Sequence, residues 1–96
     1  MRRHFIIVVN DATAEQQNAV TNHFTNRNGI GYWHWYSDMW LLIDSTNFWN
    51  AETLRDKLNE LLPANHKFVC EVRYPANWAA FGNPDTFPWL HNEWSK

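Results

Sequence analysis

Four runs of apolar residues along the chain have the length and composition of β-strands. β-Branched or aromatic side chains occur in each run, and turn-forming residues lie between several of them. The first run is apolar at consecutive positions, which is typical of a central strand. Ser37 and Asp38 separate the second and third runs, which predicts a tight hairpin. The predicted strands are residues 4–9, 32–36, 39–43 and 67–73.

Two stretches between these strands are predicted to be helical. Residues 14–27 contain no glycine or proline, and Thr13 and Gln16 have the spacing of a capping box. The second helix begins after Asn50, which can cap it, and ends at Pro63. Its buried face is predicted by leucines that recur at helical spacing. These are Leu54, Leu58, Leu61 and Leu62.

The resulting order is strand, helix, strand, strand, helix, strand, which is that of the ferredoxin-like α+β fold. In this fold an antiparallel sheet carries both helices on one face, and its first and third strands are central. We therefore predict a ferredoxin-like domain over residues 1–74 and a C-terminal extension over residues 75–96. The extension is rich in aromatic residues, whereas disordered tails are poor in them. We expect it to dock on its own sheet or on a partner's, with Asp85 or Thr86 capping a short helix over residues 87–94.

The face of the sheet without helices predicts a partner. If Tyr36 lies opposite Met39, the alternation of a hairpin puts an apolar set of side chains on each face. One set is Trp33, Trp35, Trp40 and Leu42; the other is Tyr32, His34, Tyr36, Leu41 and Ile43. The three tryptophans can expose more than about 400 Å² of apolar surface, the size of a binding site. We expect a homodimer, the alternative being a monomer whose extension folds back. The predicted interface is Trp33, Trp35, Trp40, Leu42, Trp78, Trp89 and Trp94.

Charge and cysteine content narrow the function classes. The chain has 96 residues with 10 acidic and 8 basic side chains, a formal net charge of -2, so the basic excess of most nucleic-acid-binding proteins is missing. One cysteine excludes an internal disulfide and a thiolate metal cluster, and favours a reducing compartment. The first apolar run is shorter than the core of a signal peptide, and no segment has the length of a membrane span. We expect a cytoplasmic protein.

Asp11 is the candidate for metal chemistry. It follows the first strand, where a carboxylate can bind a divalent cation, although Asp38 and Asp44 belong to another pair of strands. The favoured interpretation is that Asp11 or Asn10 caps the following helix.

Other candidate groups have simpler structural interpretations. Cys70 shares the predicted inward face of the last strand with Phe68 and Val72, which favours a small buried side chain over a nucleophile. The five histidines include no pair four residues apart on a helix. The aromatic run from Trp33 to Trp35 resembles RNA-binding sheets, but its strands lack lysine and arginine, which favours a core or an interface. Arg2, Arg3 and Arg73 are the candidate phosphate contacts. The favoured interpretation is that they belong to an ordinary charged terminus.

Three local patterns, in this order of elements, resemble the small CRISPR adaptation endonuclease family (the second Cas protein) and its SinR-type ferredoxin-like relatives. They are IIVVND, MWLLIDS followed by NAETLRDKLNELL, and FVCEVR followed by the WLHNEW end. The resemblance implies a homodimer with packed sheets and crossing C-terminal segments. In some members it implies metal-dependent cleavage of nucleic acid by paired strand-end aspartates, here Asp11.

Two functions follow as expectations. The preferred one is a homodimeric binding or regulatory protein, of the kind carried by mobile elements or phage, which uses no cofactor and binds itself and possibly another protein. The alternative is a Mg²⁺-dependent endonuclease acting on RNA or DNA, with Asp11 as metal ligand and Arg2, Arg3 and Arg73 as phosphate contacts.

Overall fold

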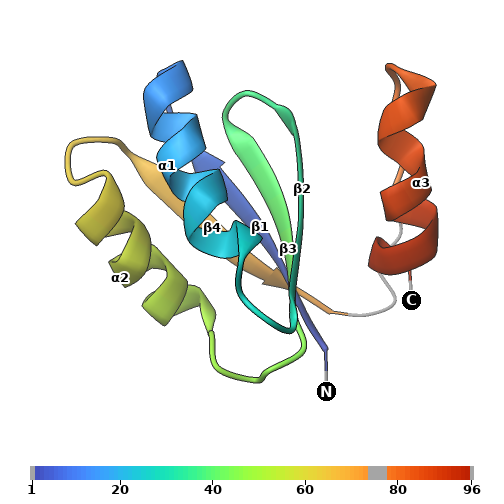
Figure 1. Cartoon of the computed structure of the whole chain (residues 1–96), viewed down its shortest axis with the longest axis horizontal. Coiled ribbons are helices and arrows are strands. Elements are labelled where there is room, and N and C mark those ends of the chain that lie inside the picture. Colours follow the sequence, from blue (N-terminus) through green and yellow to red (C-terminus); the bar gives the residue numbers. More distant parts are fainter. Residues whose placement is uncertain (1, 74–77, 96) are drawn as a thin grey trace.

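The computed structural model describes residues 2–73 and 78–95 and contains a four-stranded antiparallel sheet in the order β2-β3-β1-β4. Helices α1 and α2 cover one face, and a C-terminal helical segment lies on the other side (Figure 1). The predicted ferredoxin-like α+β fold is confirmed, with the first and third strands at the centre. The elements are β1 (Arg3–Val9), α1 (Ala14–Thr25), β2 (Ile30–Tyr36), β3 (Met39–Asp44), α2 (Ala51–Leu61), β4 (Lys67–Val72), η1 (Pro84–Thr86), α3 (Phe87–Trp89) and η2 (Leu90–Trp94).

The main core lies between the sheet and the two helices. The central strands contribute side chains with no exposed surface, and the apolar positions of the helices meet them. Burial of this apolar area is the dominant favourable term in folding. The largest fully buried side chains of this core are Trp40, Phe5, Phe24, Ile7, Leu42, Leu54 and Leu58.

Both helices begin with capping boxes. The side chain of Thr13 accepts a hydrogen bond from the Gln16 amide, and the Gln16 side chain accepts one from the Thr13 amide. Asn50 and Thr53 form the same reciprocal pair at α2. The expectation that Asp11 or Asn10 caps α1 is therefore wrong, because Thr13 occupies the N-cap position.

A β-bulge in β2 changes the predicted faces of the hairpin. Tyr36 lies opposite Met39 as expected, but Trp33 lies opposite Leu41 and Tyr32 opposite Leu42, with a register shift between Trp33 and Tyr36. One extra residue in a strand moves every side chain beyond it to the other face. The predicted grouping of Trp33 with Trp40 and Leu42 is therefore wrong: Trp40 and Leu42 belong to the helix-side core, and Trp33 lies on the opposite face.

The edge strand β4 also differs from its prediction. Phe68, Cys70 and Val72 share one face as expected, but that face points away from the helices, and Phe68 is 61% exposed. Val69 instead packs against the helix-side core. Cys70 is a half-buried free thiol and not a core residue.

The C-terminal segment, residues 78–95, packs on the sheet of its own chain. It is helical from Pro84 to Trp94, which includes the predicted helix over residues 87–94. Thr86 stands at the N-cap position of α3 as expected, although its side chain makes no capping hydrogen bond there. The preceding turn, η1, is capped by Asn83, whose side chain accepts a hydrogen bond from the Asp85 backbone amide. The predicted domain boundary between residues 74 and 75 lies outside the described residues.

Candidate functional site

The face of the sheet that points away from α1 and α2, here called the open face, carries three rows of four side chains. Directly opposite residues of antiparallel strands share a face, so the strand registers define each row. Two rows lie mainly under the C-terminal segment and are called the covered rows. They are Gly31, Ile43, His4 and Val72, and Trp33, Leu41, Ile6 and Cys70. The third, called the uncovered row, is Tyr36, Met39, Val8 and Phe68.

Specific polar contacts hold the C-terminal segment on the covered rows. The indole nitrogen of Trp33 donates to the Thr86 carbonyl at 2.7 Å. Arg2 donates to the carbonyl of Glu93 at 3.2 Å, and the same guanidinium lies 3.5 Å from the Glu93 carboxylate. Between these contacts, Leu90 and Trp94 are buried against the covered rows. The segment therefore forms a second small core on the open face.

The uncovered row extends across all four strands without a charged side chain. Phe68 is 61% and Tyr36 is 42% exposed, and Val8 and Met39 are partly exposed between them. The row lies at the end of the sheet next to the β2–β3 turn, where the Val9 amide donates to the Asp38 carbonyl. An exposed apolar row of this kind marks an interaction site.

An apolar pocket adjoins the uncovered row. Its volume is about 260 Å³, and it lies between the sheet and the C-terminal segment. Tyr36 and Met39 belong both to the pocket lining and to the uncovered row. From the other side Ala79, Ala80 and Leu90 contribute to the lining. Among the described residues, none that lines the pocket is charged, so the pocket suits an apolar group.

The predicted interface residues are divided among three environments. Trp33 and Trp94 are buried between the sheet and the C-terminal segment, where Trp78 and Trp89 are half-buried. Trp40 and Leu42 are fully buried on the helix side and have no surface to offer a partner in this fold. Trp35 is 56% exposed.

Three exposed aromatic residues on or beside the open face were absent from the predicted interface. They are Tyr36, Phe68 and Phe81, the last of which is 96% exposed. The alternation along β4 correctly predicted that Phe68, Cys70 and Val72 share one face. That face was predicted to point toward the helices, whereas it is the open face.

Asp11 lies in the turn after β1 and is exposed. Its backbone has φ 56°, a left-handed conformation that aspartate and asparagine tolerate better than most residues. The side-chain amide of Asn10 donates a hydrogen bond to the Asp11 carboxylate at 3.4 Å. Asp11 therefore belongs to a turn at the same end of the sheet as the uncovered row.

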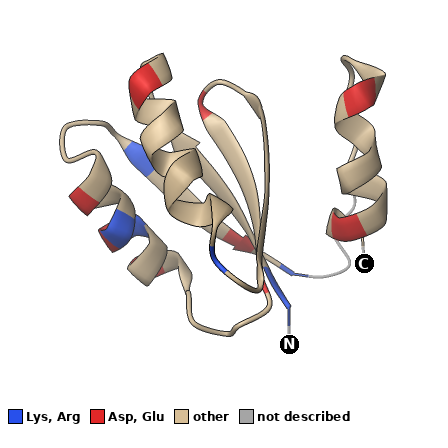
Figure 2. Cartoon of the chain, in the orientation of Figure 1, with Lys and Arg blue, Asp and Glu red and all other residues tan. Residues whose placement is uncertain are grey.

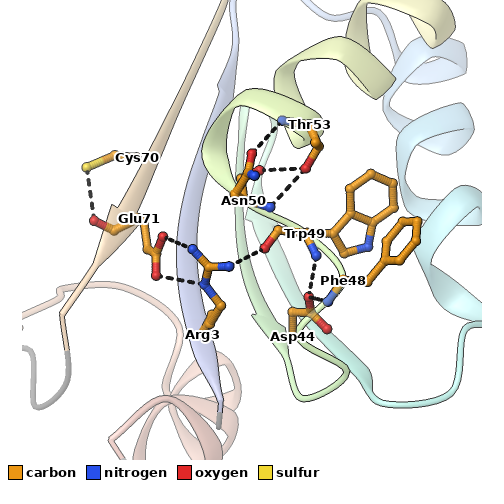
Figure 3. A network of polar contacts seen from close by, with 8 residues as sticks. All are labelled: Arg3, Asp44, Phe48, Trp49, Asn50, Thr53, Cys70 and Glu71. Carbon is orange, nitrogen blue, oxygen red and sulfur yellow. Dashed lines mark hydrogen bonds and ion pairs between the residues drawn. The ribbon is translucent and has the colours of Figure 1, made fainter.

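The candidate phosphate contacts lie at the opposite end of β1. The strand has seven residues, so Arg3 and Asp11 are separated by roughly 20 Å or more at about 3.3 Å per residue. Arg3 forms a two-pronged ion pair with Glu71, at 2.7 and 3.0 Å, and donates to the Trp49 carbonyl (Figure 3). The hydrogen bonds from Arg3 hold the pKa of Glu71 below its usual value, with a smaller contribution from Arg73. The structure thus brings Arg3 and Arg73 together around Glu71, but not beside Asp11.

Asp44 is a buried structural group. Its carboxylate accepts hydrogen bonds from the backbone amides of Phe48 and Trp49 (Figure 3). It also accepts hydrogen bonds from the backbone amide and the hydroxyl of Thr46. Burial favours a higher pKa for Asp44, but these hydrogen bonds outweigh it and lower the pKa. Asp44 therefore fixes the loop that leads into α2.

The basic residues are not gathered around the open face. Figure 2 shows them at the start of β1, in the turn after α1, on α2 and on β4, with acidic residues interspersed. Arg27 in the turn after α1 lies over the Trp49 ring at 5.8 Å, beside two hollows on the helix side. Opposite charges such as Lys57 and Glu60 border that surface. It is therefore of mixed charge, unlike the pocket on the open face.

Within residues 2–73 and 78–95, no group of three or more His, Cys, Asp or Glu side chains is placed to hold a metal ion. In the same described part of the chain, no helix is both long and apolar enough to cross a membrane. Comparisons of the chain with protein-family models, with curated proteins and with solved structures found no match.

Proposed function

We propose that this chain is a homodimeric binding protein whose subunits associate through the uncovered row of the open face. The observation that carries the proposal is the row itself: apolar side chains from all four strands lie side by side, and two of them are aromatic and largely exposed. Covering such side chains removes apolar surface from water, which is favourable. A twofold axis through the row brings the same apolar side chains of both subunits together.

The fold and the sequence resemblance support this proposal. The ferredoxin-like sheet is the architecture in which the small CRISPR adaptation endonucleases and SinR-type proteins form dimers with packed sheets. We propose a relationship to these proteins on the basis of that fold and of the IIVVND pattern ending at Asp11. Trp35, which is 56% exposed at the hairpin, is available for a further protein partner in a regulatory role. The single cysteine, which cannot form an internal disulfide, favours action in a reducing compartment such as the cytoplasm.

One observation favours the alternative function, which is metal-dependent cleavage of nucleic acid. Asp11 is exposed at the end of the sheet that carries the uncovered row, so a dimer formed through this row has both Asp11 turns near its interface. Two carboxylates with substrate phosphates form a typical Mg²⁺ site. The candidate cations for the phosphates, however, lie at the other end of β1, and two of them, Arg2 and Arg3, are engaged in ion pairs. We therefore prefer the binding function.

Sedimentation velocity over a micromolar concentration series tests the dimer. We expect a species of twice 11.5 kDa, because the uncovered row is apolar and uncharged. Phe68→Ser removes an exposed ring of the row and is expected to weaken the dimer. Phe48→Ser is the matched control, because Phe48 is 68% exposed but lies in the loop before α2. A wild-type protein that stays at 11.5 kDa throughout the series would contradict the proposal.

A further inference from the structure

We infer that the Phe81 side chain of each subunit inserts into the apolar pocket of the other subunit. This inference rests on the proposed dimer and deepens it, because it names the group of the second copy that occupies the pocket. Phe81 is 96% exposed, more than any other large apolar side chain of the described residues. Covering a ring that is this exposed is favourable.

The pocket has the size and chemistry to receive a phenyl ring. Its volume is about 260 Å³, whereas an apolar cavity of roughly 150 Å³ is known to hold benzene. Trp33, Trp78 and Trp94 contribute aromatic surfaces to its lining, and the described part of the chain adds no charged side chain to it. Insertion of the ring therefore does not require a charged group to lose its hydration, which would be costly.

Phe81 and the pocket lie on the same patch of one chain. Ala79 and Ala80 line the pocket, and Phe81 follows them directly in the sequence. In its own chain, however, the ring stays in solvent. A twofold interface brings each patch against an identical patch, so a protruding ring beside a pocket can be exchanged reciprocally.

The exposed rings supply much of the area that a specific dimer needs. Phe81, Phe68 and Tyr36 together expose about 400 Å² at roughly 200 Å² per ring. Two subunits then bury about 800 Å² from these rings alone, and the partly exposed Val8 and Met39 add to it. Specific interfaces start near 1,200 Å² in total, so insertion of Phe81 supplies a large share of what the dimer needs.

The test measures dimer dissociation constants of purified full-length variants by sedimentation velocity. Phe81→Ala is expected to raise the Kd at least tenfold without changing thermal unfolding of the monomer, measured at protein concentrations below the Kd, because the ring makes little contact within its own chain. Phe48→Ala, an exposed phenylalanine outside the open face, is the matched control and should leave the Kd unchanged. A Phe81→Ala Kd equal to that of the wild type overturns the inference and leaves the proposed dimer intact.

A complementary pair of variants tests the reciprocal exchange itself. Ala80→Phe is designed to fill the pocket from within, so this variant keeps the inserting ring but loses the receiving pocket. Mixed with Phe81→Ala, which keeps the pocket and lacks the ring, it should form a heterodimer tighter than either homodimer. No gain on mixing contradicts the exchange, and a wild-type protein without dimers overturns the proposed function and this inference together.

Discussion

His4 at the start of β1 holds Trp94 of the C-terminal segment by two contacts. Its Nε2 atom lies 3.1 Å from the Trp94 carbonyl, and the two rings meet edge to face with centroids 4.8 Å apart. Each residue is 3% exposed. Because a carbonyl only accepts hydrogen bonds, Nε2 carries a proton and donates it. The first strand and the last helical turn are thus joined inside the second core.

This contact predicts a loss of stability on mild acidification. Burial lowers the pKa of His4; the bond to the Trp94 carbonyl acts in the opposite direction, and the charge of Arg2 adds to the lowering. In the unfolded chain His4 takes up a proton near pH 6.5, whereas in the folded protein it does so only at a lower pH. The free energy of unfolding should therefore fall as the pH drops from about 6.5 toward the lower folded pKa.

Urea unfolding across this pH range measures the effect. His4→Gln keeps a donor but does not titrate, so the pH dependence should shrink; a remainder is expected from His23, whose pKa is also lowered, chiefly by burial. His66→Gln, at an exposed position, is the control. An undiminished pH dependence in His4→Gln would show that protonation of His4 is not its source.

Trp33 and Trp35 offer a matched test of the second core. Trp33 is 3% exposed and bonded to the Thr86 carbonyl, so Trp33→Ala should cost about 3–5 kcal/mol of unfolding free energy. Trp35 is 56% exposed, and Trp35→Ala should cost far less. Chemical denaturation of both variants measures the difference, and equal losses would contradict the assignment of faces.

The bulge between Trp33 and Tyr36 shows where sequence reasoning reached its limit. The two strands, the turn and the Tyr36–Met39 pair follow from hydrophobic alternation and from Ser37 and Asp38. The extra residue of the bulge could not be predicted in this way, because nothing in the residue pattern of β2 marks the point where its pairing with β3 shifts. His34 then stacks on Trp40 at 4.0 Å between ring centroids, a tertiary contact that no local pattern encodes.

The candidate site was predictable only in part for a similar reason. Aromatic content predicted that the extension docks, and Leu90 and Trp94 do pack against the sheet. Which aromatic residues stay exposed depends on how far the segment reaches across the open face. It stops short of Phe68, and Phe81 projects into solvent, two outcomes set by tertiary packing and not by the residues' own hydrophobicity.

Removal of the C-terminal segment should expose the covered rows. Without residues 76–96, Leu41 and Ile43 lose the side chains that bury them, and His4 loses its partner in Trp94. We expect the truncated chain to aggregate or to unfold at much lower urea concentration than the full chain. Unchanged stability and dimerisation of the truncated protein would contradict the role given to the segment.

The last prediction concerns Asp11 and catalysis. We expect no Mg²⁺-dependent cleavage of RNA or DNA by the purified protein, and no tight nonspecific binding of DNA at physiological salt. Even if a dimer pairs the two Asp11 carboxylates, Arg2 and Arg3 lie at the far end of β1 in ion pairs with Glu93 and Glu71. A net charge of -2 does not concentrate a polyanion around the protein.

The variant used for this test should keep the turn intact. Asp11 has φ 56°, which asparagine adopts readily and alanine adopts at a cost of roughly 1–2 kcal/mol. Asp11→Asn therefore removes the charge while preserving the backbone, whereas Asp11→Ala strains the turn; neither removes the cap of α1, which is Thr13. Asp38→Asn, in the neighbouring turn, controls for loss of a negative charge. Cleavage that persists in Asp38→Asn but disappears in Asp11→Asn, with the dimer unchanged, would replace the binding function by the nuclease.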